Sequence, residues 1–144
     1  MTPREKRKSR VLAVQLSYGC ELSDNTAENL LETCFTEENI QAEEVQEYSL
    51  KLVKLSHLNV DKVDKIINEN SKNWDITRIA LTDKLVLRLA ITEMLYFEDV
   101  PEKVSISEAV EISKVFGTKD SGTFVNGILD AVFQKINKGE YIIK

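Results

Sequence analysis

The sequence predicts an all-α protein that forms a single domain over residues 1–144. Only five glycines and two prolines occur in the 144 residues, and no segment shows the sustained period-two alternation of a half-buried strand. Apolar residues recur instead every three or four positions, as they do on one face of a helix. A chain of this length can bury a sizeable core without disulfides or metals.

The first predicted helix runs from about Pro3 to Cys20. Proline fits the first helical position, where its missing N–H would be unpaired in any case, and Leu12, Leu16 and Gly19 fit one packed face. Residues 4–10 carry a charge of +4, from Arg4, Lys6, Arg7, Lys8 and Arg10 against Glu5. Cations oppose the helix dipole at this end, so we expect these charges to serve something other than helix stability.

Three helices are predicted to follow. Thr26 to Phe35 forms a short one, and Glu43 to Leu58 forms a longer one in which apolar residues recur at helical spacing. Asn59 is expected to cap the third, which turns Val63, Ile66 and Ile67 inward.

The central part of the fold is predicted from the most apolar segment. Ser71 to Ile79 looks irregular and is expected to be anchored by Trp74, whereas Thr82 to Phe97 has apolar residues on more than one helical face. A helix that is apolar almost all round is a buried one, so this helix is expected at the centre. Pro101 is expected to end the region.

Two last helices are predicted. Ser105 and Glu108 match a capping box for a helix that reaches Phe116, with Gly117 just beyond its end. The final helix carries an apolar stripe of nearly four turns, formed by Val125, Ile128, Leu129, Val132, Phe133 and Ile136. The tail after Gly139 is expected to fray.

The residues give little support for catalysis. The sequence has one histidine, His57, expected at the surface or partly packed, and two cysteines, Cys20 and Cys34, expected as small core residues in a reducing compartment. Glu108 and Glu111 fit capping and solvation. We expect no catalytic residue, no cofactor and no metal site. The sequence also lacks a signal peptide core and an apolar run that could cross a bilayer, which favours a cytoplasmic protein without a membrane partner.

The charge is distributed unevenly. The whole chain carries −5, so the +4 of residues 4–10 leaves −9 for the remainder. A basic end on an acidic body suggests a local site for a polyanion and a different, basic partner elsewhere.

Two segments have the chemistry to bind RNA. Lys6, Arg7 and Arg10 lie three to four residues apart, so one helix face can follow a phosphate backbone. In the second segment, Lys119 adds charge near a helix N-terminus, Phe124 can stack on an unpaired base, and Asp120 and Asn126 can bond base edges. A structural interpretation competes: Phe124 packs in the core, Asp120 or Ser121 caps the helix, and Gly127 permits close packing. From these residues alone the structural interpretation is favoured.

Three segments together resemble a known family. The segment SISEAVEISKVFGTKDSGTFVNGILD (Ser105–Asp130) resembles the signature of the NusB family of bacterial transcription antitermination factors, whose members carry an EAVE…FG…S…FVNG.LD pattern. Thr82–Leu95 (TDKLVLRLAITEML) resembles the central helix of that family, and Arg7–Tyr18 (RKSRVLAVQLSY) resembles its basic first helix. The resemblance covers nearly the whole chain and is weakest from Ser23 to Asn73.

The resemblance implies about seven helices in two packed bundles. It also implies binding to boxA RNA, a single-stranded element of ribosomal RNA operon leaders, together with NusE, a small-subunit ribosomal protein, in an antitermination complex with RNA polymerase. The residues that it assigns to RNA are Lys6, Arg7, Arg10, Lys119, Asp120, Ser121 and Phe124. Those that it assigns to NusE are Tyr18 and Asp83. Lys6 and Lys8 stand where the family often has arginine.

Two other functions remain as alternatives. One is an RNA cytosine methyltransferase, a class of enzyme to which a related helical domain is fused. Such an enzyme needs an α/β cofactor-binding domain, for which a chain ending at Lys144 is expected to have no room. A helical RNA-binding or oligomerisation domain is the other alternative. A homodimer that covers the RNA-binding face also stays open, since some family members self-associate in that way.

Overall fold

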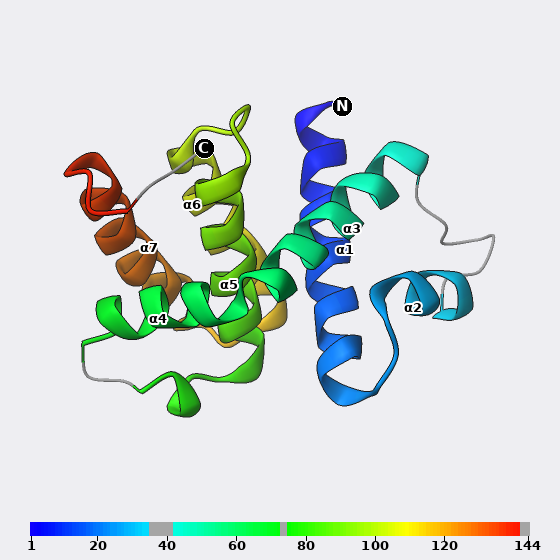
Figure 1. The fold of residues 1–144 in the computed structure, drawn as a ribbon, viewed down its shortest axis with the longest axis horizontal. Coiled ribbons are helices and arrows are strands. Elements are labelled where there is room, and N and C mark those ends of the chain that lie inside the picture. Colours follow the sequence, from blue (N-terminus) through cyan, green and yellow to red (C-terminus); the bar gives the residue numbers. More distant parts are fainter. Residues whose placement is uncertain (35–41, 73–74, 142–144) are drawn as a thin grey trace.

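The computed structural model describes residues 1–34, 42–72 and 75–141, and these form seven α-helices and one 3₁₀ turn without a strand. The elements are α1 (Pro3–Leu22), α2 (Ala27–Cys34), α3 (Glu43–Leu58), α4 (Val60–Asn70), η1 (Ile76–Arg78), α5 (Leu81–Tyr96), α6 (Glu102–Phe116) and α7 (Ser121–Asn137). Helices α1 to α3 form one group and α4 to α7 the other (Figure 1). The prediction of an all-α fold in two packed bundles is confirmed.

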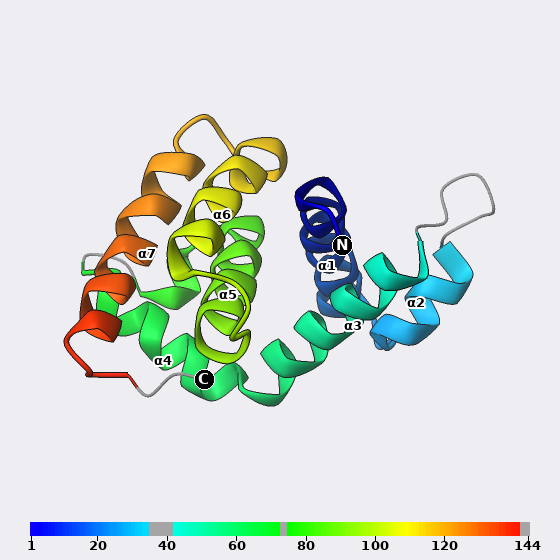
Figure 2. The same cartoon turned by 90° about the horizontal axis from the view of Figure 1, so that it is seen from above.

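Helix α5 is the centre of the core, as its apolar composition predicts. Leu87, Ile91, Met94 and Leu95 are fully buried on it. Helix α1 lies between α3 and the α5–α6 pair, and α6 lies beside α7 (Figure 2). The position of α1 between the two groups places its side chains against both.

Two contacts fix α1 against its own group. A Cβ on Gly19 would approach Leu30 Cδ1 to 2.7 Å, so the absence of a side chain lets α2 pack closely on α1, and the packed face expected at Gly19 is confirmed. Ser49 Oγ on α3 donates a hydrogen bond of 2.7 Å to the carbonyl oxygen of Ser9.

Polar contacts join α1 to the second group in antiparallel order. Arg10 near the start of α1 pairs with Glu93 near the end of α5, and Glu21 near the end of α1 pairs with Arg88 near the middle of α5. Arg88 also donates two hydrogen bonds to the carboxylate of Asp64 on α4, from Nε at 2.7 Å and from Nη2 at 2.8 Å. One arginine therefore connects three helices.

The start of α1 has a side-chain cap that the sequence analysis above does not predict. Pro3 occupies the first turn as predicted, and Thr2 and Glu5 form a reciprocal capping box. Helix α1 continues past Cys20 to Leu22. Cys20 is half-buried and packs against the core, whereas the side chain of Cys34, like Phe35 and Trp74, lies outside the described residues.

The predicted start of α6 is wrong. The helix begins at Glu102 with Pro101 as its N-cap residue, so Pro101 starts α6 instead of only ending the preceding segment. Ser105 lies inside the helix and donates a 2.6 Å hydrogen bond to Glu93 Oε1. The hydroxyl that looked like a cap is used in a contact between helices.

Two smaller predictions also change. Asn59 precedes α4 without a side-chain cap bond, and its amide donates to the carbonyl oxygen of Leu55 instead. The tail after Gly139 does not simply fray, because the hydroxyl of Tyr141 donates to Glu69 of α4 at 2.8 Å. The predicted end of α6 is confirmed, because the helix ends at Phe116 and Gly117 follows it in an extended conformation.

Candidate nucleic-acid interface

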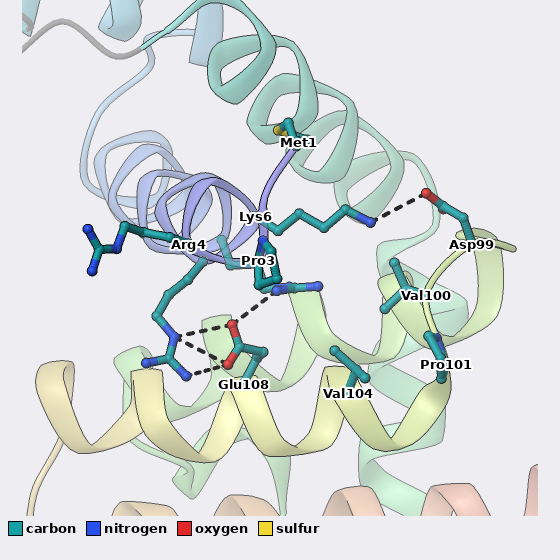
Figure 3. A pocket seen from close by; sticks show the side chains of 11 residues that line it. Met1, Pro3, Arg4, Lys6, Asp99, Val100, Pro101, Val104 and Glu108 are labelled. Atoms are coloured by element: carbon teal, nitrogen blue, oxygen red, sulfur yellow. Dashed lines mark hydrogen bonds and ion pairs between the residues drawn. The ribbon is translucent and has the colours of Figure 1, made fainter.

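The basic turns of α1 line a cavity of about 530 Å³. Its other wall is the corner between α5 and α6, where Asp99, Val100, Pro101, Val104 and Glu108 lie. Lys6 extends across one side of the opening to Asp99 (Figure 3). Arg7 donates to the carboxylate of Glu108. The structure thus gathers Lys6, Arg7 and Arg10 at one place, as their spacing on a helix predicts.

Arg10 is turned inward and is not an exposed cation. It is 7% exposed, and its Nε lies 2.9 Å from Glu93 Oε2. Its Nη1 donates to Glu108 Oε1 at 3.1 Å. A buried charge needs such partners, because removing it from water is costly. The residue therefore has a structural role that the sequence does not reveal.

Glu93 is the fully buried acceptor of this network. It is 2% exposed, and besides Arg10 it accepts hydrogen bonds of 2.6 Å from the Tyr48 hydroxyl and from Ser105 Oγ. Burial, with the negative charge of Glu93 beside it, raises the pKa of Tyr48 far above its usual value. Tyr48 therefore stays a hydrogen-bond donor, and α1, α3, α5 and α6 meet at one carboxylate.

Arg7 and Glu108 form the outer part of the network. Arg7 Nε lies 3.2 Å from each carboxylate oxygen of Glu108, and its side chain is 52% exposed. The hydrogen bonds from Arg7, with the charge of Arg10 nearby, hold the pKa of Glu108 below its usual value. Glu108 was predicted to cap or be solvated, but it binds two arginines instead.

Solvent-facing cations border this network. Arg4 and Lys8 are exposed, and the Arg4 guanidinium points away from the other labelled side chains (Figure 3). Arg4 belongs to the basic cluster of the sequence, but the family pattern did not single it out as an RNA residue. Its position one turn before Arg7 on the helix is the signal that could have done so.

The second predicted RNA segment forms the turn between α6 and α7. Lys119 and Asp120 are exposed there, and Ser121 is 2% exposed. The N–H of Thr118 donates to Ser121 Oγ at 2.9 Å, so the Ser121 hydroxyl holds the turn together. Asp120 is the N-cap residue of α7, but its side chain makes no cap bond.

The turn leaves little space for a side chain at Gly117. A Cβ on Gly117 would clash with Ser121 Oγ and would lie 2.9 Å from Asp83 Oδ1. Asp83, at the start of α5, therefore lies against the same turn. Glycine is required here because of space and not because of its backbone conformation.

Phe124 fits both the structural interpretation, as a core residue, and the RNA interpretation, as a partly exposed aromatic residue. It is half-buried and packs against the hydrophobic core, so part of the ring faces outward. Asn126 is exposed. The expectation for Gly127 is wrong, since a Cβ there would meet nothing within 4 Å. Close packing occurs instead at Gly122, where a Cβ would lie 3.2 Å from Lys114 Cε.

The two predicted RNA segments are separated by part of α6. Glu108 holds Arg7 and Arg10 at one end of this part of α6, and Gly117 lies nine positions further along the chain. At 1.5 Å per residue, nine positions correspond to about 13 Å along the helix axis. A ligand that spans several nucleotides can reach both ends.

Of the two residues assigned to a protein partner, Tyr18 lies near the end of α1, and Asp83 lies at the start of α5 against the turn between α6 and α7. Tyr18 is 41% exposed and Leu22 is 64% exposed, and their spacing of four places them on one helix face. Asp83 is half-buried. Leu22 was missed in the sequence, because the predicted helix ended at Cys20.

Comparison with known proteins decides the family. A model of the NusB family matches residues 7–134. The chain belongs to the NusB family. It is 39% identical over 139 residues to the transcription antitermination protein NusB of Desulforapulum autotrophicum, and the match covers 94% of this chain and 97% of that protein. A relative of the same name from Chloroherpeton thalassium is 36% identical over 91% of this chain, which spans 62% of that longer protein.

Solved structures agree with this assignment. T. maritima NusB superposes with a TM-score of 0.78 at 32% identity, over 98% of this chain and 99% of that one. A chain in the crystal structure of antitermination factors NusB and NusE in complex with dsRNA has a TM-score of 0.80 at 24% identity, over 92% of this chain and 98% of that one, and supports the fold. Among the described residues, no helix is long and apolar enough to span a membrane.

Proposed function

We propose that this NusB-family protein is a transcription antitermination factor that binds boxA-type RNA of ribosomal RNA operon leaders together with NusE. It acts in the cytoplasm, in the complex that keeps RNA polymerase elongating. Membership of the NusB family carries the proposal. The proposed activity is binding, and it requires no catalytic residue.

The surface of α1 supports the RNA part of this proposal. Arg4, Arg7 and Lys8 present positive charge to solvent on a protein with a net charge of −5. Phosphate contacts supply much of the affinity of proteins for nucleic acids. The turn from Lys119 to Phe124 adds an exposed cation and a partly exposed ring, which can stack on an unpaired base.

The opposite end of α1 supports the partner. Tyr18 and Leu22 form an exposed apolar pair, and aromatic residues of this kind often anchor interfaces. The acidic remainder of the chain suits a basic ribosomal protein. We propose that NusE binds there, in contact with Tyr18 and Asp83.

Equilibrium binding measurements test the function. A boxA-like RNA and a scrambled RNA of equal length are titrated with the protein, with and without NusE, across a series of salt concentrations. We expect a preference for the boxA-like RNA that increases when NusE is present. Equal affinity for the two RNAs, unchanged by NusE, would overturn the proposal.

A further inference from the structure

We propose that the groove between α6 and α7 binds an α-helix of a second protein, which places an apolar side chain in the groove and a lysine or arginine beside Asp130. Helix α7 lies on the side of α5 and α6 away from α1 (Figure 2). The residues assigned to RNA and NusE are all described in the structure, and none of them lines the groove. The inference therefore adds a third surface and does not depend on what the other two bind.

The first argument is the shape of the groove. Its volume is about 380 Å³, and its apolar floor consists of Ile106 and Val110 of α6 and Phe133 of α7. Along α6 the lining runs from Lys103 to Glu111, which is about 12 Å at 1.5 Å per residue, or slightly more than two helical turns. A helix laid into an apolar groove is a common mode of protein recognition, with anchoring side chains three or four positions apart. The length and the floor of the groove fit this mode.

The second argument is the open space at Gly127. This residue is exposed near the middle of α7, and a Cβ on it would meet nothing within 4 Å. Glycine inside a helix costs about 0.5–1 kcal/mol relative to alanine. Gly117 and Gly122 leave room for contacts within this protein, whereas no contact among the described residues uses the space at Gly127. A glycine lets another backbone come close, so a second helix can use this space.

The third argument is the composition of the solvent face of α7. Charged residues are depleted at the centre of protein interfaces relative to the rest of the surface. Charged residues make up 30% of this chain, but from position 123 to position 134 the exposed residues of α7 include a single charge, Asp130. The other exposed residues in this stretch are neutral, namely Thr123, Asn126, Gly127 and Gln134. This face therefore has the composition of an interface.

The charges at the groove favour a basic partner. Three charged residues line it, namely Lys103, Glu111 and Asp130. The ammonium group of Lys103 lies 5.8 Å from the centre of the Phe133 ring, and Lys114 binds Glu111 at 3.1 Å. Asp130 has no ion pair among the described residues. A cation of the partner would meet this carboxylate, and the net charge of −5 attracts a basic protein.

Photo-cross-linking in cells that produce the protein tests the inference. The photoreactive residue p-benzoylphenylalanine is placed at Ser107, an exposed residue on the α6 side of the groove. The control carries it at Leu58, which is 80% exposed on α3. Mass spectrometry identifies the cross-linked segment. We expect the probe at Ser107, and not the probe at Leu58, to capture a helix of another protein that has a lysine or arginine within one turn of the cross-link.

Two variants establish whether the groove itself holds that helix. Gly127→Trp fills the open space on α7, and Asp130→Lys places a cation where the partner's cation would lie. Each should lower the cross-link yield about tenfold, because a steric clash or a like-charge contact in an interface costs at least this much. Asn137→Lys adds the same charge at the end of α7 and should leave the yield unchanged. Replacing the partner's cation by glutamate should restore the yield with Asp130→Lys.

Several results would overturn the inference. These are a cross-link from Ser107 to RNA, to NusE or to a second copy of this chain, and a yield no higher than that of the Leu58 control. A cross-linked helix that neither Gly127→Trp nor Asp130→Lys weakens would overturn it as well, provided that circular dichroism shows both variants folded. A failure of the proposed function has a different result, namely equal affinity for the boxA-like and the scrambled RNA, and it leaves the cross-linking result unchanged.

Discussion

Arg10 Nε and Glu93 Oε2 lie 2.9 Å apart, with side chains only 8% and 2% exposed. The residues are 83 positions apart in the sequence, and their pairing joins the first helix to the central one. Removing one member leaves a buried charge without its partner, which is more harmful than the pair is beneficial.

Arg10→Ala should therefore destabilise the fold. We expect the free energy of unfolding to fall by about 3–5 kcal/mol, the usual effect of breaking a buried pair. Urea denaturation followed by circular dichroism measures it. Arg4→Ala, which removes an exposed arginine from the same helix, is the control and should change stability by less than about 0.5 kcal/mol. Equal stability of the two variants would contradict a structural role for Arg10.

The exposed cations should determine the salt dependence of RNA binding. Arg4→Ala and Arg7→Ala should each weaken binding and reduce the slope of log affinity against log salt by about 0.7 for each phosphate that the variant no longer neutralises. Lys138→Ala removes an exposed charge at the far end of α7 and should leave the slope unchanged. If Lys138→Ala has the same effect as Arg4→Ala, the binding reflects overall charge and not the surface of α1.

Glu108 should stabilise the protein only above acidic pH. Hydrogen bonds from Arg7 hold its pKa in the folded state below the usual 4.5, so its contribution is complete above about pH 4.5 and is lost as the pH falls through the lowered value. Glu108→Gln should cost about 1.5 kcal/mol at neutral pH, and the difference from wild type should shrink in acid. Urea denaturation at several pH values tests this, and a difference that stays constant into acid would contradict it.

Two glycines of the signature segment should respond in opposite ways to alanine. Gly117→Ala places a Cβ against Ser121 and Asp83 and should lower stability by about 1–3 kcal/mol, as overpacking does. Gly127→Ala meets nothing within 4 Å inside α7 and should raise stability by about 0.5–1 kcal/mol, because alanine is the better helix former. Thermal denaturation compares the two. Similar melting temperatures would show that the turn adapts easily.

The exposed apolar pair on α1 should contribute to NusE binding. Tyr18→Ala and Leu22→Ala should weaken the complex, Tyr18→Ala by about 2 kcal/mol if it is an anchor of the interface, while the stability of the free protein stays nearly unchanged. Isothermal titration calorimetry measures the affinity. Leu58→Ala, at an exposed leucine of α3, is the control. A NusE affinity that is insensitive to both α1 variants would place the interface elsewhere.

The sequence predicted the helices where local spacing decides them. The apolar faces of α1, α3, α5 and α7 recur with the helical period, and these helices begin and end within two residues of the predicted positions where both ends were predicted. The start of α6 was missed, because Ser105 resembles a cap in sequence while its hydroxyl is bound by Glu93.

The arrangement of the charges depends on contacts that no local pattern reveals. Lys6, Arg7 and Arg10 were predicted to share a face, and they do, but the acidic partners that divide them into exposed and buried cations come from distant segments. Glu93 lies in an apolar stretch of α5, and Glu108 lies in a segment that resembles a helix start. The pairing of positive and negative side chains around the cavity could therefore be found only after the helices were placed.

Helix α1 carries cations in its first turns and the Tyr18–Leu22 pair in its last turns without a break between them. Its 20 residues make one rod about 30 Å long, clamped near its start by Glu93 and near its end by Arg88. A partner bound at Tyr18 and Leu22 would therefore contact the same rigid helix that carries the arginines, and the length of that helix would fix the distance between the two binding surfaces.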